Sequence, residues 1–161
     1  VYSISSLQCP PDNLTGLPTS ITLDDRWSSV INLDFDFQYF GNTYNQVIIG
    51  ANGLLSFDIA DAGNFCPWNI NAADLIPSPN IPINAIHGAY HDIDPGVCGD
   101  INYLVIGSAP YRMFVVNYTD VCHFSCNDIQ SSSQIILYES SNNIDINVET
   151  RILEFNLENS F

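Results

Sequence analysis

The densest group of side chains able to bind a metal ion lies in residues 91–100. Asp92 and Asp94 flank Ile93, and Asp100 follows a Pro-Gly turn signal at residues 95–96. Calcium prefers several oxygen ligands that converge from a loop, so Asp92, Asp94 and Asp100 are the candidate calcium ligands. Their spacing is not that of an EF-hand loop. The alternative is that these aspartates cap turns through their own backbone.

Two histidines in the neighbouring segment are candidates for a second kind of metal site. His87 and His91 are four residues apart, a spacing that zinc peptidases use on a helix, but Gly88 stands where those enzymes carry a glutamate. Residues four apart also share a face on a strand, and this segment has the composition of a strand. One buried and one exposed histidine is the alternative that we favour.

The sequence evidence for residues that act in acid–base or nucleophilic catalysis is weaker than that for a metal site. The paired carboxylates Asp34 and Asp36, or Asp24 and Asp25, have the residue types of a glycosidase pair. Such charges are more typical of the solvated face of a strand. The sequence contains no Gly-x-Ser-x-Gly motif. We therefore expect no catalytic residues and no enzymatic activity.

The two tryptophans, Trp27 and Trp68, are the candidate glycan-binding residues. An exposed indole presents a large flat face on which a sugar ring can stack. The alternative is that both rings belong to the hydrophobic core, as most aromatic side chains of a small sandwich do.

Five cysteines, at positions 9, 66, 98, 122 and 126, predict disulfide bonds and an extracellular location. Their spacing is neither that of a zinc ribbon nor that of a redox Cys-x-x-C pair. We expect Cys66, Cys98, Cys122 and Cys126 to form two bridges. Spacing alone leaves their connectivity open, with Cys122–Cys126 and Cys66–Cys98 as the simplest pairs.

The charge balance excludes several classes of partner. The 161 residues include 18 acidic residues, three arginines and no lysine, for a net charge of −15. Nucleic acid and anionic membrane surfaces both require a basic patch, so neither is an expected partner. No apolar run is long enough to span a bilayer, so we expect no membrane insertion. The chain begins at Val1 without a basic and apolar leader, which predicts a processed or excised piece of a longer protein.

The side chains discussed above must be positioned by strands, because helix formers are scarce and Ile, Val, Phe, Tyr, Asn and Ser are abundant. Residues 32–39 alternate apolar and polar side chains, the pattern of a half-buried strand. Residues 46–51 and 54–57 are apolar runs joined by Asn52-Gly53, which predicts a hairpin. Further strands are predicted at residues 85–90, 101–106, 111–118, 134–139 and 144–150. In the last of these, Ile144, Ile146 and Val148 are predicted to face inward.

Residues 64–84 contain four prolines and predict a long ordered loop, with one short helical turn over residues 72–75. With 46% apolar and only 13% charged residues, the chain can bury a real core. We therefore predict one domain over residues 1–161, an antiparallel β-sandwich with a jelly-roll-like arrangement.

Several motifs resemble a known type of extracellular module. Residues 35–44 have the pattern Phe-x-Phe-x-x-Phe-Gly-x-x-Tyr, and residues 52–57 read Asn-Gly-x-x-Ser-Phe. Supporting motifs lie at residues 65–68, 86–95, 99–103 and 114–126. Together they resemble the β-sandwich modules of large surface adhesins that gliding Bacteroidota export through the type IX system. The first two motifs also resemble the opening of nidogen-like extracellular domains.

The resemblance implies a noncatalytic module of a large bacterial cell-surface adhesin, which acts in adhesion or display. A secreted glycan-binding accessory domain or hydrolase is the alternative. The resemblance covers residues 24–149, and modules of this type usually close with a Trp-containing turn and one more strand, which residues 152–161 do not offer. We therefore expect an atypical tail and an incomplete fold at this end, with a neighbouring domain or an added strand at the sheet edge.

Overall fold

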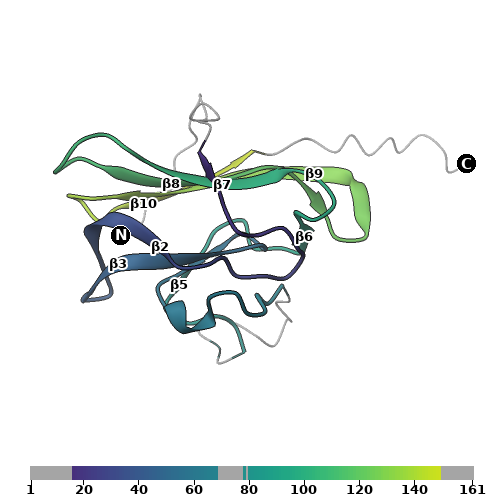
Figure 1. The fold of residues 1–161 in the computed structure, drawn as a ribbon, viewed down its shortest axis with the longest axis horizontal. Coiled ribbons are helices and arrows are strands. Elements are labelled where there is room, and N and C mark those ends of the chain that lie inside the picture. Colours follow the sequence, from purple (N-terminus) through teal and green to yellow (C-terminus); the bar gives the residue numbers. More distant parts are fainter. Residues whose placement is uncertain (1–15, 69–77, 79, 150–161) are drawn as a thin grey trace, which may run out of the picture.

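The chain folds into two antiparallel β-sheets that face each other, as the computed structural model shows for residues 16–68, 78 and 80–149 (Figure 1). The first sheet contains β1 (Leu17–Pro18), β6 (Ile93–Asp94), β7 (Asp100–Ile106), β8 (Met113–His123), β9 (Cys126–Tyr138) and β10 (Ile144–Glu149). Its order is β1-β7-β8-β9-β10, and β6 pairs with β8. The second sheet has the order β2 (Ile31–Tyr39), β3 (Asn42–Gly50), β4 (Leu54–Ser56) and β5 (Ala85–His87). The predicted antiparallel β-sandwich is confirmed.

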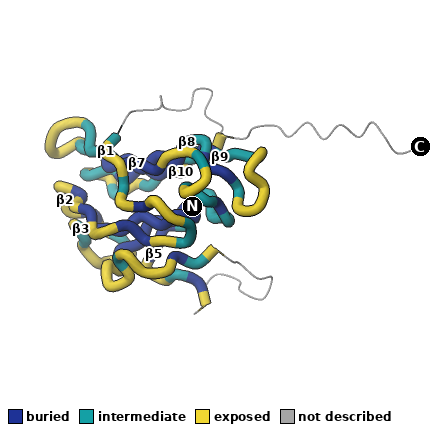
Figure 2. Tube along the Cα trace, turned by 45° about the vertical axis from the view of Figure 1, so that its right-hand side comes forward, coloured by how far each residue is buried: buried dark blue, intermediate teal, exposed yellow. Residues whose placement is uncertain are grey.

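The core lies between the two sheets, where buried residues gather and exposed ones lie outside (Figure 2). Strand β2 shows why: its residues from Ile31 to Gln38 alternate strictly between buried and exposed. Leu33 and Phe37 are fully buried, and they share one hydrophobic cluster with Phe114 and Leu137 of the opposite sheet. The period of two in the sequence is therefore the direct cause of this layer.

The predicted hairpin at Asn52-Gly53 is confirmed as the β3–β4 connection, in which Gly50 pairs with Leu54. Gly53 has a φ of 79°, and a Cβ at this position would lie 2.5 Å from the carbonyl oxygen of Ala89. Only glycine fits both requirements. From the opposite sheet, the buried Tyr118 hydroxyl reaches the carbonyl oxygens of Gly50 at 2.9 Å and Leu54 at 3.1 Å. This contact fixes the hairpin to the six-stranded sheet.

Some strands differ in length from the predicted ones, because their polar residues lack the apolar pattern on which the prediction depends. Strand β8 continues to His123 and β9 begins at Cys126, so the two form a hairpin much longer than predicted. In its polar part, Asn117 donates to Asn102 at 2.9 Å and accepts from Gln134 at 2.7 Å. Cross-strand amide bonds therefore replace apolar alternation here. The helical turn predicted over residues 72–75 lies outside the described residues.

The last strand, β10, departs from its predicted burial. Ile144, Ile146 and Val148 pair with Leu137, Ile135 and Ser133 and so lie on the inner face, as predicted. Ile146 is nevertheless 43% exposed and Val148 57% exposed. The six-stranded sheet is broader than the four-stranded sheet opposite, and β10 is at its edge. Within the described residues, no helix has the length and apolar character needed to cross a membrane.

Candidate functional site

Asn52, in the β3–β4 turn, organises the loops at one end of the sandwich. Its side chain is fully buried, and its amide donates to Asp25 Oδ1 at 2.9 Å. The same amide lies 3.3 Å from the carbonyl oxygen of Cys66 and 3.4 Å from that of Pro67. Its Oδ1 accepts from the Ile93 backbone N–H at 3.2 Å. One side chain therefore joins three segments that are far apart in the sequence.

These contacts bring together three carboxylates, Asp24, Asp25 and Asp92, which we call the acidic cluster. One oxygen from each lies within 4.8 Å of the others. Asp24 and Asp25 precede Trp27, which forms a β-bridge with Gly50, and Asp92 precedes β6. The cluster thus combines two loops that the Asn52 side chain holds side by side.

The electrostatics of the acidic cluster are unfavourable without a cation. Asp24 Oδ1 is a buried oxygen with no hydrogen-bond partner. Burial, and then the charges of Asp25, Asp94 and Asp92, raise the pKa of Asp24 to about 6. Burial, followed by Asp25 and Asp94, also raises the pKa of Asp92. Each shift means that burial and like charges outweigh the interactions that favour the ionised carboxylate in the folded chain.

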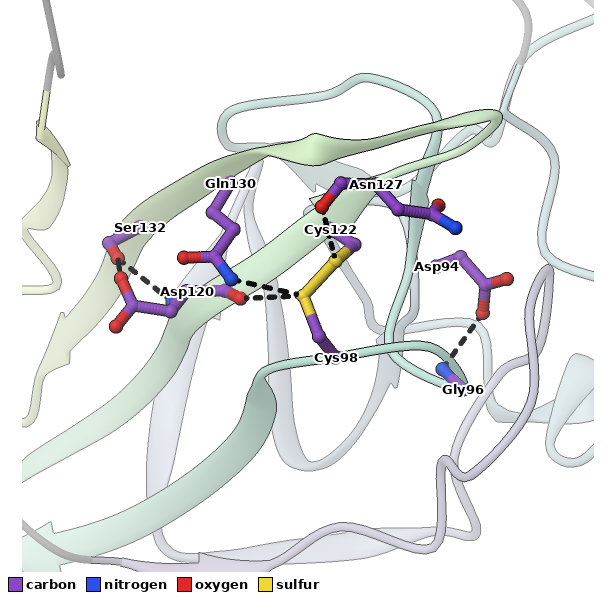
Figure 3. The surroundings of a disulfide bond; sticks show 8 residues. All are labelled: Asp94, Gly96, Cys98, Asp120, Cys122, Asn127, Gln130 and Ser132. Atoms are coloured by element: carbon purple, nitrogen blue, oxygen red, sulfur yellow. Dashed lines mark hydrogen bonds between the residues drawn. A yellow bond between two sulfur atoms is a disulfide. The ribbon is translucent and has the colours of Figure 1, made fainter.

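The predicted calcium ligands are only partly brought together. Asp92 belongs to the acidic cluster. Asp94 lies close enough for its charge to raise the pKa of Asp24. Its Oδ1, however, accepts from the Gly96 N–H at 2.8 Å (Figure 3), so Asp94 caps a turn, as the alternative interpretation predicts. Asp100 is exposed at the start of β7 and accepts from Asn102 Nδ2 at 2.8 Å. The sequence spacing did not identify Asp24 and Asp25 as calcium ligands, because both are distant in sequence from Asp92. The available signal was that these two aspartates are adjacent to each other.

A disulfide bond joins Cys98 and Cys122, which are separated by 24 positions in the sequence (Figure 3). Cys98 lies in the turn before β7, and Cys122 lies near the end of β8. Gln130 Nε2 donates to Cys98 Sγ at 3.4 Å, and the Cys122 N–H donates to the Cys98 carbonyl at 3.4 Å. The bridge therefore fixes the loop that follows β6 onto the β8–β9 hairpin.

The simplest predicted pairs, Cys66–Cys98 and Cys122–Cys126, are wrong. Cys126 stands opposite His123 at the tip of the β8–β9 hairpin, and Cys98 approaches Cys122 instead. Cys66 is a free thiol, fully buried against Trp27, and burial raises its pKa to about 12. Cys126 is free and exposed. The fifth cysteine, at position 9, lies outside the described residues.

The two tryptophans have different surroundings. Trp27 is only 4% exposed and packs with Ile48, Leu54 and Cys66, so its ring has no free face for a sugar. Its assignment as a glycan-stacking residue is therefore corrected to a core role. Trp68 is 42% exposed, so glycan stacking by Trp68 stays a prediction.

The histidines do not form the pair considered from the sequence spacing. The His91 ring lies against that of His123, with 4.8 Å between ring centroids, and its Nε2 is 2.9 Å from Ser131 Oγ. His87 Nε2 is 3.1 Å from the carbonyl oxygen of Pro82. Burial, and then the neighbouring His91, lower the pKa of His123.

A family model described as NIDO related matches residues 4–159, nearly the whole chain. No curated protein and no solved structure matches the chain.

Proposed function

Because the chain belongs to the NIDO-related family, we propose that it is a noncatalytic module of a large bacterial cell-surface protein, where it serves adhesion or display. The family match and the Cys98–Cys122 disulfide indicate an extracellular module, since disulfides persist outside the reducing cytosol. The proposal goes beyond this extracellular assignment in two respects: the module is part of a larger cell-surface protein, and it serves adhesion or display.

The motifs that carry the resemblance support a scaffold rather than a catalytic site. Phe37, Tyr39 and Tyr44 each have ring centroids within 5.8 Å of the Phe57 ring. These four residues belong to the two sequence motifs that resemble adhesin modules of gliding Bacteroidota exported by the type IX system. Because the motif residues build the core, they support kinship of the fold with those modules.

The disulfide in a NIDO-related chain is the observation that carries the proposal. The external location that it implies can be tested on intact cells of the source organism. Protease treatment of unlysed cells should release peptides of this chain. Mass spectrometry without reduction should find the peptides containing Cys98 and Cys122 linked. Peptides that appear only after lysis, or a reduced Cys98–Cys122 pair, would contradict an external location. Polysaccharide hydrolysis by the purified chain would contradict the noncatalytic role.

We also propose that the acidic cluster binds calcium, with Asp24, Asp25 and Asp92 as the ligands. Two observations support it: Asp24 Oδ1 is buried without a hydrogen-bond partner, and one carboxylate oxygen from each of the three residues lies within 4.8 Å of the others. Calcium takes carboxylate oxygens from flexible loops, and a bound cation would remove the repulsion among them. The expected neighbours Asp94 and Asp100 instead accept hydrogen bonds from Gly96 and Asn102.

The calcium proposal is tested by thermal melting at neutral pH. Millimolar calcium should raise the melting temperature relative to a chelator, because a ligand that binds only the folded chain stabilises it by mass action. Asp92→Asn should abolish the rise, while Asp36→Asn, on the exposed face of β2, should retain it. Equal melting temperatures with calcium and with chelator would exclude the site. A rise that survives Asp92→Asn would place calcium elsewhere.

A further inference from the structure

Strand β10 forms an edge of the six-stranded sheet. Within the described residues it pairs only with β9, through a continuous antiparallel register from Ile144–Leu137 to Glu149–Ser132. The register contains no bulge, a device that often protects an edge from further pairing. No bulge in this register therefore interrupts the row of backbone groups on the open side of the strand.

The hydrogen-bonding register shows which backbone groups face the open side. The Tyr138 N–H donates to the Asn143 carbonyl at 3.1 Å, one position before the Ile144–Leu137 pair. In an antiparallel ladder, bonded pairs alternate with non-bonded pairs. Asp145, Asn147 and Glu149 therefore direct their backbone groups to β9. The N–H and C=O groups of Ile144, Ile146 and Val148 point away from β9.

The side chains of β10 give this edge two chemically distinct faces. On the inner face, Ile146 and Val148 are 43% and 57% exposed. On the outer face, Asp145 and Glu149 are exposed carboxylates, and Asp145 Oδ2 accepts from the Tyr138 hydroxyl at 2.8 Å. The edge thus offers alternating apolar and acidic side chains along the same row of backbone groups.

We propose that the β10 edge binds an extended segment of another protein in which apolar and basic residues alternate. Directly opposed residues of antiparallel strands share a face. Apolar side chains of the segment would cover Ile146 and Val148, and its lysines or arginines would lie beside Asp145 and Glu149. The segment does not come from a second copy of this chain, because the 161 residues include no lysine and only three arginines. Antiparallel pairing of two β10 strands through their open sides would also bring Asp145 and Glu149 of both copies onto one shared face.

The probe is a synthetic peptide of alternating valine and lysine, added to the 161-residue chain. Binding should protect the amides of Ile144, Ile146 and Val148 from hydrogen exchange, because these N–H groups become donors to the added strand. Affinity should fall about fivefold between about 0.05 M and about 0.3 M salt, as expected for exposed charge pairs. A valine–glutamate peptide of the same length should not bind.

Variants at Val148 separate backbone pairing from apolar contact. Val148→Pro removes an N–H that faces the open side without removing a bond to β9, and should weaken peptide binding at least about tenfold. Val148→Ala removes the same apolar side chain but keeps the N–H, and should weaken binding by no more than about threefold. Circular dichroism checks that both variants fold.

Three outcomes would overturn the proposal. The first is peptide binding that leaves the amides of Ile144, Ile146 and Val148 unprotected. The second is binding that Val148→Pro does not change more than Val148→Ala does. The third is full protection of these amides in the chain alone, which would mean that its own residues or a second copy cover the edge; sedimentation distinguishes the two. The exchange experiment on the unaltered chain decides the matter even where Val148→Pro fails to fold.

Discussion

At the scale of single residues, two polar side chains with buried atoms in adjacent loops have opposite hydrogen-bonding situations. Asn52 uses both its donor and its acceptor, to Asp25 and to the Ile93 N–H. Asp24 leaves its buried Oδ1 without a partner. Asn52 therefore stabilises the loop arrangement, while Asp24 stores an unfavourable interaction that protonation or a cation would relieve.

Removing the Asn52 side chain should be costly. Asn52→Ala leaves the Ile93 N–H and one Asp25 oxygen without these partners in a buried region, so the free energy of unfolding should fall by about 3 kcal/mol in urea denaturation. Asn32→Ala is the matched control, because Asn32 is exposed and bonded to Gln46; it should change stability by less than about 0.5 kcal/mol. A similar small effect for Asn52→Ala would show that the loops do not depend on this residue.

The raised pKa of Asp24 predicts a loss of stability with rising pH. The folded chain holds this proton with a pKa of about 6, against the ordinary 3.8. The stabilisation from the bound proton is complete below about pH 3.8 and is lost as the pH rises through about 6. The measurement is the urea midpoint of Asp24→Asn minus that of the unaltered chain, with a chelator present. This difference should be larger at about pH 7.5 than at about pH 5.

Other titrating groups must be separated from this effect. The lowered pKa of His123 acts in the opposite direction, since stability from its neutral form is gained as the pH rises. Arg112 lowers the pKa of Glu139 to about 2. The contribution of ionised Glu139 to stability is therefore lost only in acid, as the pH falls below the ordinary Glu pKa. Both groups persist in Asp24→Asn, so the difference between the two chains isolates Asp24. Parallel pH profiles for the two chains would contradict the assigned shift.

At the scale of elements, the loop after β6 depends on a covalent bond rather than on a regular strand. Cys98 and Cys122 close a loop of 24 positions, which predicts that Cys98→Ser/Cys122→Ser lowers the free energy of unfolding by about 3 kcal/mol in urea. Cys126→Ser, which alters an exposed free thiol on the same hairpin, should have an effect below about 0.5 kcal/mol. Equal stabilities of the double and single variants would mean that the bridge does not stabilise this loop.

The sequence predicts those elements whose own residues contain the signal. The alternation in β2 and the Asn52-Gly53 turn are local, and both predictions are confirmed. The burial of Ile146 and Val148 is not local, because it depends on how far the opposite sheet extends. The Cys98–Cys122 pairing and the approach of Asp24 to Asp92 likewise depend on which loops meet in space. Spacing along the chain carries no information on such contacts.

At the scale of the whole molecule, both sheets contribute to one hydrophobic cluster. Phe37 of β2 lies in it with Val116 of β8, and each is fully buried. Neither sheet can bury its inner face without the other, so the two should unfold as one cooperative unit. The Tyr118 hydroxyl bonds to the β3–β4 hairpin add a polar link across the same interface.

A single truncation in one sheet should therefore destabilise the other. Phe37→Ala should lower the free energy of unfolding by about 4 kcal/mol, from lost burial and the cavity left behind. Hydrogen exchange should show the same loss of protection for β8 amides as for β3 amides, because both exchange through global unfolding. Phe40→Ala is the matched control, since Phe40 is 84% exposed and only three positions away. Loss of protection confined to β2 and β3, with β8 unchanged, would show instead that the six-stranded sheet keeps its structure independently.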